Sequence, residues 1–210
     1  MEIRFLQHQM NPHFLFNVLL TIQIKAKRSG NETIYKMVSK LSALLRASIY
    51  TNNVDRITVG EELEYTEFYL YLQKMRFEDR FFYKIIVEDE ELKKSIIPKF
   101  VIEPIVENAV IHGIENIENE GVIRIVLKKM GTDLLVTVQD NGAGFDVKEY
   151  FNSLEQAENG SSREKIGLKN VDLRLRHIYG EEYRIKIKSK INTGTTIYIK
   201  IPIEEREENV

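Results

Sequence analysis

The sequence contains no cysteine and only four histidines in 210 residues. The absence of cysteine excludes disulfide bonds, thiol nucleophiles and thiolate metal sites, and it suits a reducing compartment. Four histidines scattered along the chain also argue against a site dense in metal ligands. The candidate functions therefore exclude thiol chemistry and clustered metal chemistry.

Long apolar runs and an excess of positive charge are missing as well. No run approaches the roughly 18 to 20 apolar residues that a membrane-spanning helix needs, and the first ten residues, MEIRFLQHQM, lack the apolar core of a signal peptide. Because 30 basic residues face 32 acidic ones, for a formal charge of -2, no overall positive field favours nucleic acid or an anionic membrane. We expect a soluble chain that binds no nucleic acid.

The first 50 residues carry the apolar spacing of α-helices. One run is already under way at Ile3 with no N-cap before it, which predicts a piece of a longer protein. The run breaks at residues 29–31, and a second run follows with Asn31 as its N-cap. An antiparallel hairpin of two such helices cannot bury its narrow apolar stripes alone. We predict that residues 1–56 dimerise into a four-helix bundle; the alternative is that both stripes pack on the rest of the same chain.

Residues 57–210 carry alternating strand and helix patterns. Thr58 and Glu61 form a capping box that opens a helix. Further helices are predicted at 98–113 and 166–179, and strands at 81–88, 122–130, 133–140, 183–190 and 195–201. The predicted fold class is α+β, with the helical hairpin followed by an α/β sandwich whose mixed sheet has helices on one face.

Asp140 ends the predicted strand 133–140 in phase with its apolar residues, so its carboxylate points inward. An unpaired buried carboxylate costs about 3 to 5 kcal/mol, so it needs a hydrogen-bond donor, and the exocyclic amine of a purine would serve. A hairpin turn is the alternative, because Asp-Asn-Gly is a strong turn signal. The polar stretch that follows supplies no returning strand. Gly142 and Gly144 instead indicate backbone kept bare for the close approach of a ligand.

Polar residues also interrupt the apolar helix predicted at 98–113. Asn108 and His112 are four apart and share a face, with Glu107 about 100° round the helix from Asn108. An asparagine oxygen suits Mg²⁺, and a glutamate can orient or deprotonate a nucleophile. A polar edge on a surface helix is the alternative.

Two weaker signals follow. Gly167 opens a helix whose free backbone N–H groups would suit phosphate, and residues 147–165 form a polar loop of the length of a lid. The stretch 192–196 taken alone is typical of a hairpin turn.

Five motifs, taken in order, resemble one family. They are NPHFLFN (11–17), VENAVIHG (106–113), DNGAGFD (140–146), IGLKNVDLRL (166–175) and TGTTIYIKIP (193–202). They resemble the histidine box, N box, G1 box, G2 box and terminal strand of sensor histidine kinases of the LytS/YesM type, which join a histidine-box hairpin to a GHKL (Bergerat) ATPase domain. Residues 63–81 also resemble the linker helix of that family.

The resemblance implies roles for individual residues. His13 would be the phosphoacceptor, a neutral imidazole whose phosphoramidate can pass the phosphoryl group on; His8 is the rival acceptor. Asp140 would bind the adenine amine with help from Thr195 or Thr196. Asn108 would hold Mg²⁺ between the phosphates of ATP, beside Glu107 as an aid to the nucleophile. His112 would lie near the phosphates or ribose, and the pocket and lid would be shaped by Gly142, Gly144, Gly167, Leu168 and Asn170.

The sequence departs from many relatives at two places. Lys165 and Arg163 stand where a Gly-x-Gly pattern is common in the G2 box, which puts the phosphate contacts there in doubt. Phe14 follows His13 where many other histidine kinases have an acid, so no base for His13 is visible locally, as is usual for the family that the chain resembles.

The resemblance implies the cytoplasmic portion of a bacterial plasma membrane sensor, attached through a segment outside these residues. It would use ATP and Mg²⁺, autophosphorylate as a homodimer and pass the phosphoryl group to an aspartate of a response regulator receiver domain. One alternative is a degenerate, non-catalytic dimer scaffold that binds nucleotide. Another is an ATP-hydrolysing conformational machine with the same nucleotide fold.

Overall fold

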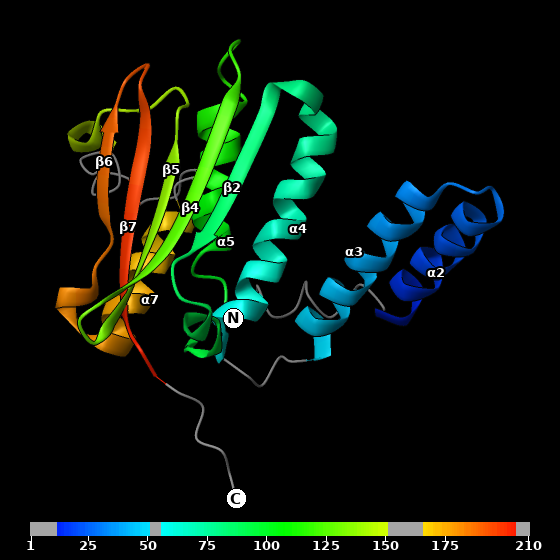
Figure 1. Ribbon diagram of the computed structural model, residues 1–210, viewed down its shortest axis with the longest axis horizontal. Helices are drawn as coiled ribbons and strands as arrows, with labels where there is room; N and C mark the ends of the chain where they lie inside the picture. The colour runs from blue at the N-terminus through cyan, green and yellow to red at the C-terminus, as the bar shows by residue number, and fades with distance from the viewer. Residues whose placement is uncertain (1–11, 51–55, 151–165, 205–210) are drawn as a thin grey trace, which may run out of the picture. The chain divides into compact units, whose positions relative to one another are not determined.

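A computed structural model describes residues 12–50, 56–150 and 166–204 (Figure 1). The chain divides into two compact units, residues 1–55 and 56–210, and each is described by itself. The start of the first predicted helix with His8, the link 51–55, and the lid segment with Arg163 and Lys165 lie outside the described residues.

The first unit contains two packed helices, α2 (Pro12–Arg28) and α3 (Glu32–Tyr50). Gly30 turns the chain between them with a φ of 70°, a left-handed conformation that glycine adopts without strain. Asn31 Oδ1 then accepts a hydrogen bond from the N–H of Ile34 at 3.0 Å, which confirms Asn31 as the N-cap of α3. The two-helix hairpin is therefore present as predicted.

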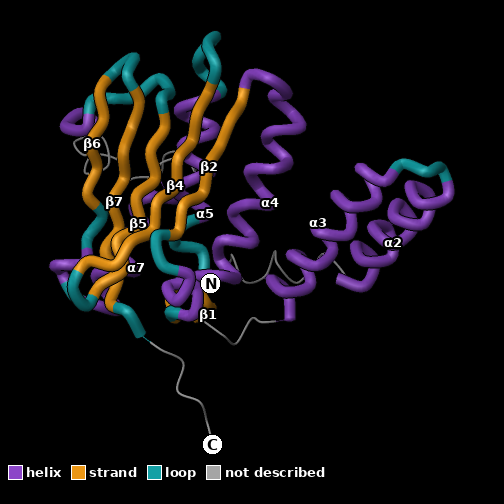
Figure 2. The backbone as a smooth tube through the Cα atoms, viewed as in Figure 1, coloured by secondary structure: helices purple, strands orange, loops and turns teal. Residues whose placement is uncertain are grey.

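The second unit is built on a five-stranded sheet with the order β2-β4-β5-β7-β6 (Figure 2). Its strands are β2 (Phe81–Val87), β4 (Gly121–Met130), β5 (Asp133–Asp140), β6 (Lys186–Lys190) and β7 (Gly194–Pro202). β2 pairs with β4 in parallel and every other pairing is antiparallel, so the sheet is mixed, as predicted.

Helices cover one face of this sheet. They are α5 (Glu103–Asn108), a π-helical segment η3 (Ala109–Ile114) and α7 (Ile166–Tyr179); α5 and α7 lie behind the sheet in Figure 1. Apolar side chains on the inward face of the sheet form the core with them: Ile123, Ile125, Leu127, Leu134, Val136, Val138, Ile197, Ile199 and Ile201. The predicted fold class is confirmed.

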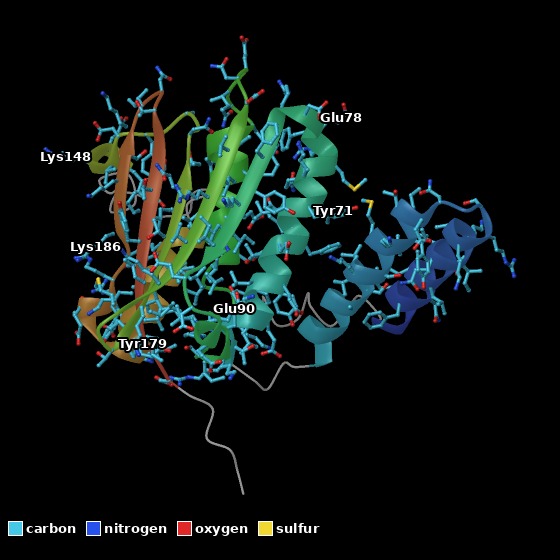
Figure 3. All side chains as sticks on the ribbon, viewed as in Figure 1. Tyr71, Glu78, Glu90, Lys148, Tyr179 and Lys186 are labelled. Carbon is cyan, nitrogen blue, oxygen red and sulfur yellow. The ribbon has the colours of Figure 1, made fainter. Side chains whose placement is uncertain are left out.

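Helix α4 (Val59–Phe77) opens with the predicted capping box. Thr58 Oγ1 accepts from the N–H of Glu61 at 3.1 Å, and the Glu61 carboxylate accepts from the N–H of Thr58 at 2.8 Å. At the far end of α4, Glu78 lies where the chain turns towards β2 (Figure 3). Short helical segments are η1 (Glu78–Arg80), η2 (Glu90–Lys94) and η6 (Glu181–Tyr183), and residues 147–150 are also helical.

The sequence did not predict a second, two-stranded sheet. β1 (Arg56–Thr58) pairs antiparallel with β3 (Ile96–Pro98), and each strand has three residues. A period of two cannot be recognised over so short a length.

The predicted helix 98–113 begins and ends differently. Pro98 closes β3, and the helix starts at Glu103 with Pro104 in its first turn. The chain between them is turned by Phe100, whose φ of 56° is left-handed and interrupts any helix. Gly113 does not end the helix either, because the π-helical segment η3 runs through it to Ile114. No described helix is both long enough and apolar enough to cross a membrane.

Candidate functional site

A cavity of about 280 Å³ opens between the helices and the strands β5 and β7 of the second unit. It is lined by residues of α5, η3, β5, β7 and α7 and of the segment after β5: Ile105, Asn108, Ala109, His112, Gly113, Val138, Asp140, Gly144, Phe145, Tyr150, Leu168, Thr195 and Ile197. Most of these side chains are apolar, with a few polar groups among them, as in pockets that bind small molecules.

Asp140 is the buried acid of this cavity, with 6% of its surface exposed. Its Oδ1 accepts hydrogen bonds from the backbone N–H of Gly142 at 2.9 Å and of Thr195 at 3.2 Å. Burial raises the pKa of the Asp140 carboxyl, and these backbone hydrogen bonds oppose the rise. The predicted inward orientation is confirmed. Because both bonds end on Oδ1, Oδ2 remains for a donor in the cavity.

The glycines around Asp140 are required by backbone packing, a reason that the sequence did not predict. A Cβ on Gly142 would overlap the backbone of Gly113, and one on Gly144 would overlap the carbonyl of Lys190. Gly142 is not among the described residues that line the cavity, whereas Gly144 lines it. These glycines let three segments of the chain pack closely, and their predicted role in the close approach of a ligand stays a prediction.

Asn108 and His112 both line the cavity, as their spacing of one helical turn predicts. Asn108 Nδ2 donates to the carbonyl of Pro104 at 2.6 Å, which directs Oδ1 away from that bond. A Cβ on Gly167 would lie 3.2 Å from Asn108 Nδ2, so the start of α7 meets α5 at this side chain. Asn108 and Leu168 therefore line the cavity, whereas Gly167 is not among its described lining residues and lies against Asn108.

Some predicted residues do not face the cavity. Glu107, Asn170 and Thr196 are not among the described residues that line it; Glu107 and Asn170 are exposed and Thr196 is half-buried. Thr196 alternates with Thr195 along β7, so only Thr195 points inward. His13 belongs to α2 in the other unit.

The sequence reasoning missed several residues of the site. Phe145 and Tyr150 line the cavity with their rings 5.1 Å apart, and Gly113 lies directly against Asp140, where a Cβ would come within 2.9 Å of Oδ1. The spacing of Gly113 was a usable signal, because it lies four residues after Ala109, which also lines the cavity. Phe145 lies in the irregular chain after β5, and Tyr150 lies in a helical stretch of which only residues 147–150 are described, too short for a period to be recognised.

An acidic edge lies beside the cavity on α5. Burial raises the pKa of Glu103 to about 7, and the charges of Glu107 and Glu62 raise it further in the same direction. Glu103 is thus a half-buried carboxyl that gains a proton near neutral pH.

The protein oxygen atoms in the cavity suit a magnesium ion only if a bound ligand supplies further oxygen atoms. The Asn108 amide can offer Oδ1, a hard oxygen, and the described residues contain no group of three His, Cys, Asp or Glu that could hold a metal. Magnesium is commonly held by one or two protein oxygens together with phosphate oxygens and water. Asn108 would be the protein ligand to such an ion.

Two family models match the chain. One, described as histidine kinase, matches residues 1–81, and the other, described as histidine kinase-, DNA gyrase B- and HSP90-like ATPase, matches residues 94–205.

Curated relatives are similar over nearly the whole chain. The sensor histidine kinase YesM of Bacillus subtilis is 37% identical over 96% of this chain and 33% of its own length. The sensor histidine kinase YpdA of Escherichia coli is 34% identical over 96% of this chain and 34% of its own. The sensor protein LytS of Staphylococcus haemolyticus is 32% identical over 100% of this chain and 35% of its own. The chain therefore spans about a third of the length of these relatives.

Solved structures share the fold. The catalytic domain of the histidine kinase ThkA superposes with a TM-score of 0.54 at 16% identity, covering 70% of this chain and 96% of that one. The histidine kinase domain of the blue-light activated histidine kinase EL346 from Erythrobacter litoralis gives 0.50 at 15% identity, over 94% and 91% of the two chains. By the two family models and the curated relatives, the chain belongs to the sensor histidine kinase family of the LytS/YesM type, with an ATPase domain of the histidine kinase, DNA gyrase B and HSP90 class.

Proposed function

We propose that this chain is the catalytic portion of a sensor histidine kinase that transfers the γ-phosphoryl group of ATP to His13. The observation that carries the proposal is Asp140, a buried carboxylate with one oxygen held by backbone and the other left to the cavity. A hydrogen-bond donor on a flat apolar ring suits this site, and the adenine amine is such a donor.

The other cavity residues have roles that follow from their chemistry. Apolar side chains such as Ile105 and Ile197 enclose the base, and the backbone bond from Thr195 holds Asp140 in place. Asn108 would offer its amide oxygen to a magnesium ion bound together with the nucleotide, and such a cation would supply positive charge against the phosphates. Gly167 brings the first N–H groups of the 14-residue helix α7 next to Asn108, where they can meet phosphate oxygens.

The proposed transfer is one displacement at phosphorus. An imidazole nitrogen of His13 attacks the γ-phosphorus, and a nitrogen–phosphorus bond forms. The bond between that phosphorus and the oxygen bridging to the β-phosphate breaks, and ADP leaves with the electron pair. The imidazole proton is lost to a base or to water. A carboxylate oxygen of a receiver-domain aspartate of a response regulator then attacks this phosphorus, the nitrogen–phosphorus bond breaks, and the imidazole nitrogen leaves with the electron pair and takes up a proton from water.

The helical hairpin carries exposed apolar side chains that a second copy of the chain could cover. Leu20 and Ile24 lie one helical turn apart on α2, and they are 52% and 45% exposed. Val18, Ile22 and Ile34 are also exposed. The hairpin alone does not bury these side chains, which supports the proposed homodimer through residues 1–56. Attachment to a bacterial plasma membrane through a segment outside this chain is part of the same proposal.

The test is labelling with γ-labelled ATP and Mg²⁺, using wild type, His13→Ala and His8→Ala. We expect a label that is stable to base and labile to acid, and that is lost in His13→Ala but kept in His8→Ala. ATP binding without any label would indicate the non-catalytic scaffold. Fast release of free phosphate that His13→Ala does not change would indicate an ATP-hydrolysing machine.

A further inference from the structure

Glu62 is a fully buried carboxylate outside the cavity, on α4, with 0% of its surface exposed. Its oxygens accept hydrogen bonds from four successive backbone N–H groups. Phe100 donates to Oε2 at 2.9 Å, and Val101, Ile102 and Glu103 donate to Oε1 at 2.8, 2.9 and 3.4 Å. Such a converging run of N–H groups is an anion-binding nest.

The nest depends on strained backbone. Phe100 has a φ of 56°, in the left-handed region that a bulky residue enters only at a cost. The left-handed residue turns the chain so that its own N–H and the next three point towards one acid. Glu62 therefore fixes the chain at the point where α5 begins.

A second contact from α4 fixes the other end of the same segment. Arg76 Nη1 lies 2.5 Å from Glu115 Oε1, one residue after the π-helical segment η3. The backbone N–H of Glu115 donates to the carbonyl of Val110 at 2.9 Å, a bond that spans five residues and belongs to the π-helix. The residue whose side chain pairs with Arg76 thus also closes the π-helical turn.

The segment between these two contacts carries the cavity residues. Asn108, His112 and Gly113 all lie on it and all line the cavity, and Gly113 lies against the carboxylate of Asp140. α4 packs on α5 between the contacts. It is also the first helix after residue 55, where the N-terminal unit ends.

We propose that α4 positions the nucleotide-facing segment 103–114 through two anchors, Glu62 at its start and Arg76 at its end, so that a displacement of α4 changes nucleotide affinity. Neither residue touches the nucleotide in this proposal; both are positioning residues. A helix held at both ends moves as one body with its anchors, and the π-helical turn beside Arg76 is the part that can change register. The inference rests on the proposed nucleotide binding.

The test is a charge swap in the full chain: Arg76→Glu, Glu115→Arg and the double variant, with Arg80→Ala as a control on an exposed arginine without a described partner. The dissociation constant of a fluorescent ATP analogue is measured with Mg²⁺ well below the unfolding temperature. We expect each single variant to bind about two- to fivefold more weakly, as for an exposed ion pair, and the double variant to recover wild-type affinity. Glu62→Gln should weaken binding about tenfold or more, because its amide N–H₂ replaces an acceptor, whereas Glu64→Gln on the exposed face should not.

Hydrogen exchange without nucleotide is the second readout. The amides of residues 109–115 should exchange faster in each single charge variant and return to the wild-type rate in the double variant. Unchanged affinity and unchanged exchange in Arg76→Glu and Glu115→Arg would overturn the proposal, whether or not Glu62→Gln folds. If wild type binds no nucleotide but the exchange rates follow the expected pattern, the anchors stand and the proposed kinase function fails.

Discussion

Replacing Asp140 with asparagine should change which purine the cavity prefers. The N–H groups of Gly142 and Thr195 need an acceptor, so the asparagine Oδ1 should keep their bonds at 2.9 and 3.2 Å. The amide Nδ2 then takes the position of the carboxylate Oδ2 and presents two N–H donors to the cavity. The adenine amine, itself a donor, would face a donor in place of an acceptor.

The size of the effect follows from the bond that is lost. A hydrogen bond to a charged group contributes about 1.5 to 3 kcal/mol, so Asp140→Asn should bind ATP about 10- to 150-fold more weakly. Inosine triphosphate carries a carbonyl oxygen in place of the amine. The wild-type carboxylate repels that oxygen, and the asparagine amide can donate to it, so the variant should prefer inosine triphosphate to ATP.

Competition against a fluorescent nucleotide measures both affinities in wild type and in Asp140→Asn, and thermal unfolding without nucleotide checks that the variant is folded. The reasoning is refuted if the variant weakens both nucleotides equally, or if it leaves the preference for ATP unchanged. Either result would mean that Asp140 acts on the protein backbone and not on the base.

Three further predictions use other parts of the structure. Glu103→Gln should stabilise the protein above about pH 7 by at most about 3 kcal/mol. Because the pKa of Glu103 is raised to about 7, the wild-type protein has its full free energy of unfolding below about pH 4.5 and loses part of it as the carboxyl ionises towards pH 7. Urea unfolding at about pH 5 and about pH 8 measures the difference between the two proteins, and an equal pH dependence in both contradicts the prediction. Asn108→Ala should weaken ATP binding with Mg²⁺ but hardly change it with a chelator, since only the metal contact depends on the amide oxygen; an equal loss in both buffers counts against the role. The double variant Leu20→Lys, Ile24→Lys should sediment as a monomer where the wild type sediments as a dimer, because both side chains are exposed apolar groups of α2. The control Lys25→Ala should leave the dimer intact. If the double variant is still a dimer, these residues do not form the dimer interface.

The sequence predicted the elements whose signal is local and repeated. The strands β4 and β5 follow the period of two over ten and eight residues, and the capping box of α4 needs only Thr58 and Glu61. The inward position of Asp140 followed from the same period. Asn108 and His112 followed from the helical period and their spacing of four.

The parts that the sequence did not predict depend on contacts between distant segments. The start of α5 is displaced to Glu103 because the N–H groups of the preceding residues bind Glu62, which lies about 40 positions earlier in the chain. The packing of Gly142 on Gly113 joins the motifs 140–146 and 106–113, and neither motif alone indicates it. A local sequence pattern gives the conformational propensity of a segment, but it does not show the distant partner that overrides this propensity.

The most direct test of the account is the site of the phosphoryl group after the full chain has been incubated with ATP and Mg²⁺. Peptide mass analysis under alkaline conditions, which preserve phosphohistidine, should find one phosphoryl group on the peptide that contains His13, and none when Asp140→Asn is incubated with the same low concentration of ATP. A phosphoryl group on another residue, or a wild-type chain that stays unmodified while ATP is bound, would contradict the claim that this cavity supplies His13 with phosphate.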